Sequence, residues 1–433
     1  MTGDGPRFHS LDAWLSWQET LHPKAIDLGL ERVQRVYRRL GARRPAPRVI
    51  TVAGTNGKGS AVALLEAIYR AAGYRVGAYT SPHLLRYNER VRIDAVEVSD
   101  AALCGAFARI DAARGAASLT YFEFGTLAAL ELFADAALDI ALLEVGLGGR
   151  LDAVNIVDAD VALITRIGRD HTDWLGEDLE SIGREKAGVF RAGAAAICAD
   201  PAPPAVLERR ARELGARWFA AGERFRASIR AHDWDWQGPG VTYRHLPPPK
   251  VEGVHQLDNA AGVLMAVQYL SAQLPVAREA LISGLRSAQL PGRGQRIEGD
   301  VEQWLDVAHN PQAAAALAGV LAQRPARGRT WAVFGIMADK DCGAFVAALA
   351  GRVDGWFATA LRTPRALPVE ALFACIEAAD TGHPVTACMD MRAARRAALD
   401  AAHPGDRILV CGSFYTVAEW LAASETEAGN SYA

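Results

Sequence analysis

Residues 49–60, Val-Ile-Thr-Val-Ala-Gly-Thr-Asn-Gly-Lys-Gly-Ser, decide the fold class of this chain. The first five are apolar or β-branched, which predicts a buried strand. A glycine turn follows, and the alanine- and leucine-rich residues 61–72 predict a helix that stops at Gly73. A strand, a glycine turn and a helix in this order are typical of one βα unit in a parallel sheet.

The same alternation continues along the chain, with further predicted strands at residues 75–80, 139–145 and 160–167. We therefore predict an α/β fold with a mainly parallel sheet. Residues 201–249 are rich in Trp, Arg and Pro, which predicts irregular or antiparallel structure at a sheet edge, before a helix at 255–270.

Turn residues cluster in Leu-Pro-Gly-Arg-Gly at 290–294, and a new β/α alternation begins there. Its predicted strands are residues 302–307, 330–334, 355–358 and 407–411. We place a domain boundary at this point, with a first domain of residues 1–290 and a smaller α/β domain of residues 291–433.

The composition is that of a globular protein, with 433 residues, 50% hydrophobic and 22% charged. The formal net charge of −3 gives no reason to expect nucleic acid or an acidic membrane surface as a partner. The six cysteines form no C-x-x-C pair, and no signal peptide or membrane span is predicted. We expect a cytoplasmic protein.

The turn at residues 54–60 has the features of a phosphate-binding loop. Its glycines allow backbone N–H groups to turn inward, Lys58 adds a positive charge, and the helix N-terminus adds its dipole. Ser60 is placed to bind the magnesium ion of a nucleotide. The spacing is shorter than G-x-x-x-x-G-K-[ST], and Gly59 separates Lys58 from Ser60, so an ordinary glycine-rich βα turn is the alternative.

Polar residues also follow three of the predicted strands: Ser81, Glu144 and His171. Ligands of parallel sheets bind outside the carboxyl ends of the strands. If these strands neighbour the glycine turn, the three side chains meet Ser60 at one or two Mg²⁺ ions. Each alone is more often a turn or surface group. Lys186, on a predicted helix at 179–190, is either solvated or a phosphate contact.

The second domain has a similar arrangement in Asp-Val-Ala-His-Asn-Pro at 306–311, after a strand and before a helix. Asp306 could bind a ribose hydroxyl or an incoming amine, and His309 could touch phosphate or substrate. Arg293, near the domain boundary, could stabilise charge on the γ-phosphate. A simple helix N-cap is the alternative interpretation of this motif.

Taken together, the motifs resemble the Mur ligase superfamily, and within it the branch of dihydrofolate synthases and folylpolyglutamate synthases. The matching segments occur in family order and are Gly54–Ser60, Ser81–Leu84, Glu144–Asp152, Asp170–His171, Glu185–Gly188, Pro291–Arg293 and Asp306–Pro311. The resemblance covers nearly the whole chain. It implies an N-terminal domain with a phosphate loop, a smaller Rossmann-like C-terminal domain, and ATP clamped between them.

The resemblance also assigns residues to ATP and its metal ions. It implies that the triphosphate is bound by Gly57, Lys58, Gly59 and Ser60. Two magnesium ions would be bound by Ser81, Glu144 and His171. The adenosine and phosphate contacts are Asn259, Arg293 and Asp306. Lys186 corresponds to a lysine that the family carbamylates, which would place an anionic group beside the second metal.

An acceptor pocket is implied as well, because residues 26–33, Ile-Asp-Leu-Gly-Leu-Glu-Arg-Val, look like the segment that bifunctional members use to bind dihydropteroate. The implied pocket residues are Asp27, Leu28, Gly29, Leu30, Phe122, Glu123, Phe124, Gly125, Leu151, Asp152 and Ala153. Aromatic faces beside a carboxylate suit a pterin, although Phe122 and Phe124 could also be helix core. Val154 and Gly294 depart from the residues that relatives often carry.

The expected activity is therefore ATP-dependent addition of L-glutamate to dihydropteroate and to tetrahydrofolates through an acyl phosphate, by a monomer with small-molecule partners. Two alternatives stay open within the enzyme class: a monofunctional folylpolyglutamate synthase and a ligase of peptidoglycan-precursor type. A third is a protein that uses ATP as a switch to bind a partner.

Overall fold

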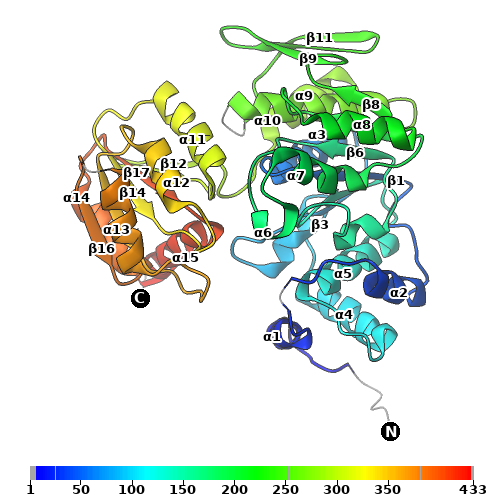
Figure 1. Cartoon of the computed structure of the whole chain (residues 1–433), viewed down its shortest axis with the longest axis horizontal. Coiled ribbons are helices and arrows are strands. Elements are labelled where there is room, and N and C mark those ends of the chain that lie inside the picture. Colours follow the sequence, from blue (N-terminus) through cyan, green and yellow to red (C-terminus); the bar gives the residue numbers. More distant parts are fainter. Residues whose placement is uncertain (1–5, 25, 251–253, 381, 431–433) are drawn as a thin grey trace. The chain divides into compact units, whose positions relative to one another are not determined.

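A computed structural model describes residues 6–24, 26–250, 254–380 and 382–430 (Figure 1). The fold divides into two compact units, one formed by most of the first 289 residues and a second formed mainly by residues 290–433. Both units are α/β, as the sequence predicts, and each has its own sheet.

The first unit is built on an eight-stranded sheet with the order β4-β3-β2-β5-β1-β6-β7-β8. All neighbouring pairs are parallel except those that β3 makes with β2 and β4. The strands are β1 (Arg48–Ala53), β2 (Val76–Tyr79), β3 (Val91–Ile93), β4 (Val96–Glu97), β5 (Ile140–Glu144), β6 (Val161–Ile164), β7 (Ala195–Cys198) and β8 (Arg217–Ala220). The glycine turn therefore leaves a central strand, β1.

Side chains that alternate along these strands supply two hydrophobic cores, one on each face of the sheet. Ala141 and Leu143 of β5 belong to one core, and Leu142 between them belongs to the other. The first core is completed by α1 (Leu11–Leu21), α2 (Glu31–Arg39), α4 (Asp100–Arg114), α5 (Tyr121–Asp135), α7 (Leu179–Lys186) and α8 (Ala205–Leu214). The second is completed by α3 (Lys58–Ala71), α9 (Val254–Tyr269) and α10 (Arg278–Ser287).

The expectation for residues 201–249 was wrong in its first part. The helix α8 and the strand β8 extend the parallel sheet, with Ala195 of β7 opposite Arg217 of β8. The second part is antiparallel as predicted, in a three-stranded sheet of β9 (Arg226–Ile229), β10 (Trp234–Gly238) and β11 (Val241–Leu246). Trp234 and Trp236 of β10 anchor this sheet in the second core.

The second unit contains a six-stranded sheet with the order β12-β13-β17-β14-β15-β16, parallel except for β12. Its strands are β12 (Gln295–Ile297), β13 (Glu302–Leu305), β14 (Thr330–Phe334), β15 (Gly355–Thr359), β16 (Val385–Cys388) and β17 (Arg407–Cys411). Its helices are α11 (Pro311–Gln323), α12 (Cys342–Leu349), α13 (Val369–Ala379), α14 (Met391–Ala401) and α15 (Phe414–Asn430). Four of its strands match the predicted ones, and β12 and β16 were missed.

Within the described part of the chain, helices are too short or too polar to cross a bilayer.

Candidate active site

The glycine turn after β1 is a tight loop that leads directly into α3. Gly57 caps α3 with a φ of +92°, a conformation that strongly favours glycine. A Cβ atom at Gly57 would lie 2.6 Å from the Nδ2 atom of Asn259 on α9. The loop and Asn259, predicted separately as nucleotide contacts, are therefore packed against each other.

Neighbouring backbone holds this loop in place. The Thr55 N–H donates to the carbonyl of Arg166 at 2.8 Å, and the Thr165 hydroxyl donates to the carbonyl of Asn56 at 2.8 Å. The ammonium of Lys58 folds over the loop and donates to the carbonyls of Gly54 at 3.0 Å and Thr55 at 3.2 Å. A charged amine over a turn of inward-facing backbone at a helix N-terminus suits a phosphate chain.

Three of the predicted metal ligands are Ser60 in the loop-capped helix α3, Glu144 at the end of β5 and Ser81 after β2. Glu144 ends β5 opposite Val52 of β1 and is buried, with 4% of its surface exposed. The Ser81 N–H donates to Glu144 Oε2 at 3.2 Å, so the ends of β2 and β5 meet. Ser60 is buried in the first turn of α3. Carboxylate and hydroxyl oxygens are ligands of the kind that a magnesium ion prefers.

His171, the fourth predicted ligand, follows β6 at the same edge of the sheet. Its backbone is left-handed, with a φ of +52°, and its N–H donates to the Asp170 carboxylate at 2.9 Å. An αL backbone in a histidine is uncommon and often occurs at functional positions. His171 is also the N-cap of the short helix α6 (Thr172–Leu175).

Lys186 at the end of α7 is a buried lysine, with 3% of its surface exposed. Burial lowers the pKa of its amine to about 7, and the charge of Lys58 lowers it further, while Asp170 and Asp152 act in the opposite direction. Burial also raises the pKa of Asp152 to about 6. The backbone N–H groups of Leu147 and Val154, which donate to its carboxylate, act to lower that pKa but do not outweigh burial. Two lysines and two aspartates thus share one electrostatic environment.

Glycines bring the segment 144–152 and the end of α7 together. A Cβ atom at Gly149 would lie 2.9 Å from the carbonyl oxygen of Glu185, and one at Gly188 would lie 2.3 Å from Cβ of Arg150. The Arg150 N–H donates to the Glu185 carbonyl at 2.8 Å. These two motifs are distant in sequence, and their close backbone packing is what carries Lys186 to the sheet edge.

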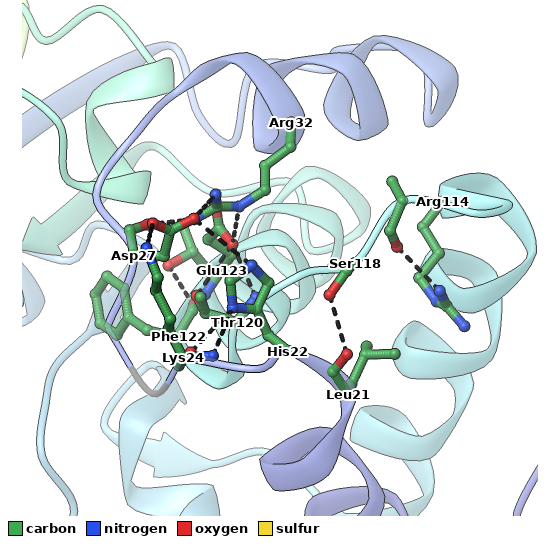
Figure 2. Close-up of polar contacts among 12 residues, drawn as sticks. Leu21, His22, Lys24, Asp27, Arg32, Arg114, Ser118, Thr120, Phe122 and Glu123 are labelled. Atoms are coloured by element: carbon green, nitrogen blue, oxygen red, sulfur yellow. Dashed lines mark hydrogen bonds and ion pairs between the residues drawn. The ribbon is translucent and has the colours of Figure 1, made fainter.

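Three of the predicted acceptor-binding residues, Asp27, Phe122 and Glu123, lie together at the first turn of α5 (Figure 2). Glu123 is buried, and its Oε2 accepts hydrogen bonds from the Thr120 N–H at 2.8 Å and from the Arg32 Nε at 2.8 Å. Arg32 also binds the carboxylate of Asp27. Phe122 lies beside this cluster in Figure 2, and its ring packs on Gly146 and Tyr79.

Other predicted acceptor residues have different surroundings. Phe124 has no exposed surface and packs on Trp17 and Phe107 in the first core, which is the alternative role considered for it. A Cβ atom at Gly125 would lie 2.4 Å from the Tyr87 hydroxyl. Of the remaining residues, four are half-exposed: Leu28, Gly29, Leu30 and Leu151. Asp152 and Ala153 are buried.

In the second unit, Arg293, Asp306 and His309 form one polar group. The Asp306 carboxylate accepts the N–H groups of Gly294 at 2.9 Å and Ala308 at 2.8 Å. Burial raises the pKa of Asp306, while the charge of Arg293 opposes the rise. The Arg293 guanidinium lies 5.4 Å from the centre of the Phe414 ring.

Comparison with known proteins agrees with this arrangement. Residues 52–199 match the Mur ligase middle domain, and residues 292–414 match the Mur ligase glutamate ligase domain. The chain is 48% identical over 408 residues to the dihydrofolate synthase/folylpolyglutamate synthase of Escherichia coli, covering 94% of each chain. The chain belongs to the dihydrofolate synthase/folylpolyglutamate synthase family of Mur ligases. The predicted resemblance is thereby confirmed.

Solved structures of dihydrofolate synthase/folylpolyglutamate synthase family members share the fold. The Escherichia coli protein in complex with DHPP and ADP matches with a TM-score of 0.93 at 46% identity, over 98% of this chain and 100% of that chain. A bifunctional folylpolyglutamate synthase/dihydrofolate synthase with Mn, AMPPNP and L-glutamate bound matches with a TM-score of 0.89 at 47% identity, over 97% and 99%. The predicted α/β fold class is confirmed.

Neither Thr120 nor Arg32 was named individually as a site residue, although Arg32 lies in the predicted acceptor segment 26–33. For Thr120 a signal existed, because Thr120 and Glu123 have the T-x-x-E spacing of a capping box, which the structure forms. For Arg32 the signal was the resemblance of residues 26–33 to an acceptor-binding segment, but its ion pair with Glu123, 91 residues away, was not predicted.

Proposed function

We propose that the chain is an ATP-dependent ligase that adds L-glutamate to 7,8-dihydropteroate and to tetrahydrofolates. Relatives of 48% and 40% identity over nearly the full chain carry the name of both activities. Structures of similar proteins hold ADP, AMPPNP, Mn and L-glutamate, as their names state. ATP and a divalent metal ion are thus the cofactors we assign.

One observation carries this proposal: a glycine loop with a half-buried lysine, a buried carboxylate and a buried lysine lie at the carboxyl edge of one sheet. Lys58 covers the loop, and Glu144 ends the adjacent strand. Burial, together with the charge of Lys58, lowers the pKa of Lys186 to about 7. Such a set handles a polyanion and its counter-ions. It would have little use in a site for an uncharged ligand.

In the proposed reaction, the substrate carboxylate attacks the γ-phosphate of ATP, and ADP leaves with the electrons of the broken P–O bond. The glutamate amine then attacks the acyl phosphate, which yields an amide and inorganic phosphate. The loop N–H groups and Lys58 bind the phosphates and neutralise charge that spreads over them. Magnesium, held by Ser60, Ser81, Glu144 and His171, would supply further neutralisation.

We assign the remaining residues by the same proposal. We assign nucleotide contacts to Gly57, Gly59 and Asn259 and, as the resemblance implies, to Arg293, Asp306 and His309. Lys186 is assigned to the metal side of the site. Its pKa near 7 leaves a substantial fraction of the amine neutral, and only a neutral amine forms a carbamate with CO₂. This chemistry is compatible with the carbamylation that the resemblance implies.

We also propose the domain assignment 1–290 for the ATP- and pterin-binding part and 291–433 for the glutamate ligase part. We further propose that the protein acts as a monomer in the cytoplasm on small-molecule substrates, without nucleic acid or membrane. The net charge of −3 supports the absence of a nucleic-acid partner.

The test is ADP release by the purified protein, with Mg²⁺ and ATP, in the presence of glutamate and either dihydropteroate or tetrahydrofolate. We expect glutamate-dependent turnover with both acceptors and none without Mg²⁺. Turnover with tetrahydrofolate alone would instead assign a monofunctional synthase. Nucleotide binding without glutamate-dependent turnover would contradict the proposal and favour an ATP switch.

A further inference from the structure

Arg32, at the start of α2, joins two acidic residues that come from different parts of the chain. Its Nε donates to Glu123 Oε2 on α5 at 2.8 Å, and its two terminal nitrogens bind the carboxylate and the backbone carbonyl of Asp27. Figure 2 shows the guanidinium between these two groups. A planar guanidinium presents its N–H donors in a rigid fork, so it binds both acids in a fixed geometry.

The charges of this Asp27–Arg32–Glu123 cluster support one another. Burial by itself would raise the pKa of Asp27, but the charge and hydrogen bond of Arg32 outweigh it, so the pKa is lowered. Burial by itself would lower the pKa of Arg32. Its hydrogen bonds and ion pairs with Glu123 and Asp27 outweigh burial, so the pKa of Arg32 is raised. His22 and Lys24 add weaker contacts to Asp27, at 3.5 and 3.7 Å.

The hydrogen bonds to Glu123 are unevenly distributed. The Thr120 N–H, the Thr120 hydroxyl and Arg32 all donate to Oε2. The other oxygen, Oε1, is enclosed and receives no hydrogen bond from any residue that the structure describes. A buried carboxylate oxygen without a donor is unfavourable, and a ligand N–H that reaches it recovers that loss.

We propose that Arg32 is a positioning residue for the acceptor substrate: it fixes Glu123 so that Oε1 is the oxygen left to accept the N–H groups of the pterin edge. This inference rests on the proposed function, because it takes a pterin as the ligand. Arg32 acts through Glu123 and has no part in the chemical step.

Arg32 also links Glu123 to a segment that lies outside helices and strands. Residues 26–30 are half-exposed and lie outside helices and strands, whereas α5 is buried in the first core. Because Oε1 has no exposed surface, a ligand reaches it only if neighbouring residues shift. Asp27, within the segment 26–30, is held to Glu123 through Arg32, so a shift of this segment and the position of Glu123 are coupled.

The experiment compares Arg32→Ala with Arg35→Ala, a matched control on an exposed position of the same helix. We expect Arg32→Ala to raise the KM for dihydropteroate by about 10-fold or more. The Kd for dihydropteroate, measured by calorimetry without ATP, should rise by the same factor. We expect kcat and KM for ATP to stay within about threefold, and Arg35→Ala to match the wild type. Arg32→Lys should lie between, since a point charge replaces the fork.

A double-mutant cycle separates positioning from a general structural role. In a Glu123→Gln background, Arg32→Ala should add little to the loss that Glu123→Gln already causes. If the two losses multiply, or if kcat and KM for ATP change as much as KM for dihydropteroate, the inference is overturned. Arg32→Gln replaces Arg32→Ala in the cycle should the alanine variant fail to fold.

The calorimetric arm distinguishes failure of this inference from failure of the proposed function. A wild type that binds dihydropteroate without turnover would contradict the function, while the Kd values of the variants would still decide the role of Arg32. A wild type that turns over dihydropteroate, together with an Arg32→Ala variant of unchanged Kd and KM, would overturn the inference alone. Absence of any dihydropteroate binding would overturn both.

Discussion

The buried amine of Lys186 makes the stability of the protein depend on pH in a specific way. Burial and the charge of Lys58 lower its pKa from 10.5 to about 7. An unfolded lysine therefore keeps its proton up to about pH 10.5, while the native one loses it near pH 7. Between these values the unfolded state binds more protons, so the stability of the wild type rises with pH.

The size of the effect follows from the two pKa values. At pH 7 the cost of Lys186 to the native state is about 4 kcal/mol, and at pH 9 it is about 2 kcal/mol. Lys186→Met keeps the length of the side chain and removes the titration. We therefore expect the variant to be more stable than the wild type at pH 7, and this advantage to shrink by about 2 kcal/mol at pH 9.

The assay is urea unfolding at several pH values between 7 and 9, in bicarbonate-free buffer without metal or nucleotide. The exposed Lys250 provides a control, because Lys250→Met removes a lysine that is not buried. The stability difference between Lys250→Met and the wild type should not change with pH. A difference between Lys186→Met and the wild type that is equally independent of pH would refute the reasoning.

Three further predictions concern residues that we assign to the nucleotide or that support its loop. Glu144→Gln should lower Mg²⁺-dependent ADP release by more than about 100-fold with an unchanged circular dichroism spectrum, and near-normal release would contradict the metal assignment. Gly54→Ala should cost about 1–3 kcal/mol in urea unfolding, because φ is +149° and the added Cβ would lie 1.9 Å from the Thr165 hydroxyl; a neutral effect would refute the packing argument. Asp306→Asn should weaken ATP binding in calorimetry and lower Tm by a few degrees, since an amide offers one acceptor oxygen for two N–H donors; unchanged values would show that the carboxylate is dispensable.

Most of the sheet could be predicted because its strands are short apolar runs that end in polar turn residues. The predicted strands at 330–334 and 407–411 coincide with β14 and β17. The edge strands were harder. β8 and β16 expose part of each strand to solvent, so their sequences lack the continuous apolar pattern of a buried strand.

The candidate metal ligands could be predicted because each follows a strand, and strand order alone brings strand ends together. The burial of Lys186 could not be predicted, because nothing in the sequence of its own helix indicates it. A lysine at the end of a short helix is normally solvated, and here glycine-mediated packing of residues 144–152 on α7 removes it from water. Arg32 lies in the predicted acceptor segment 26–33, but its ion pair with Glu123 on α5 was not predicted, because only the tertiary fold shows that these two side chains meet.

The most direct test of the nucleotide site is X-ray diffraction from crystals grown with Mn²⁺ and a non-hydrolysable ATP analogue, recorded at the manganese edge. We predict an anomalous peak within coordination distance of the Ser60 hydroxyl and the Glu144 carboxylate, with the analogue's phosphates on the glycine loop beneath Lys58. A manganese peak elsewhere, with the imidazole of His171 and the carboxylate of Glu144 turned away from the phosphates, would contradict the account.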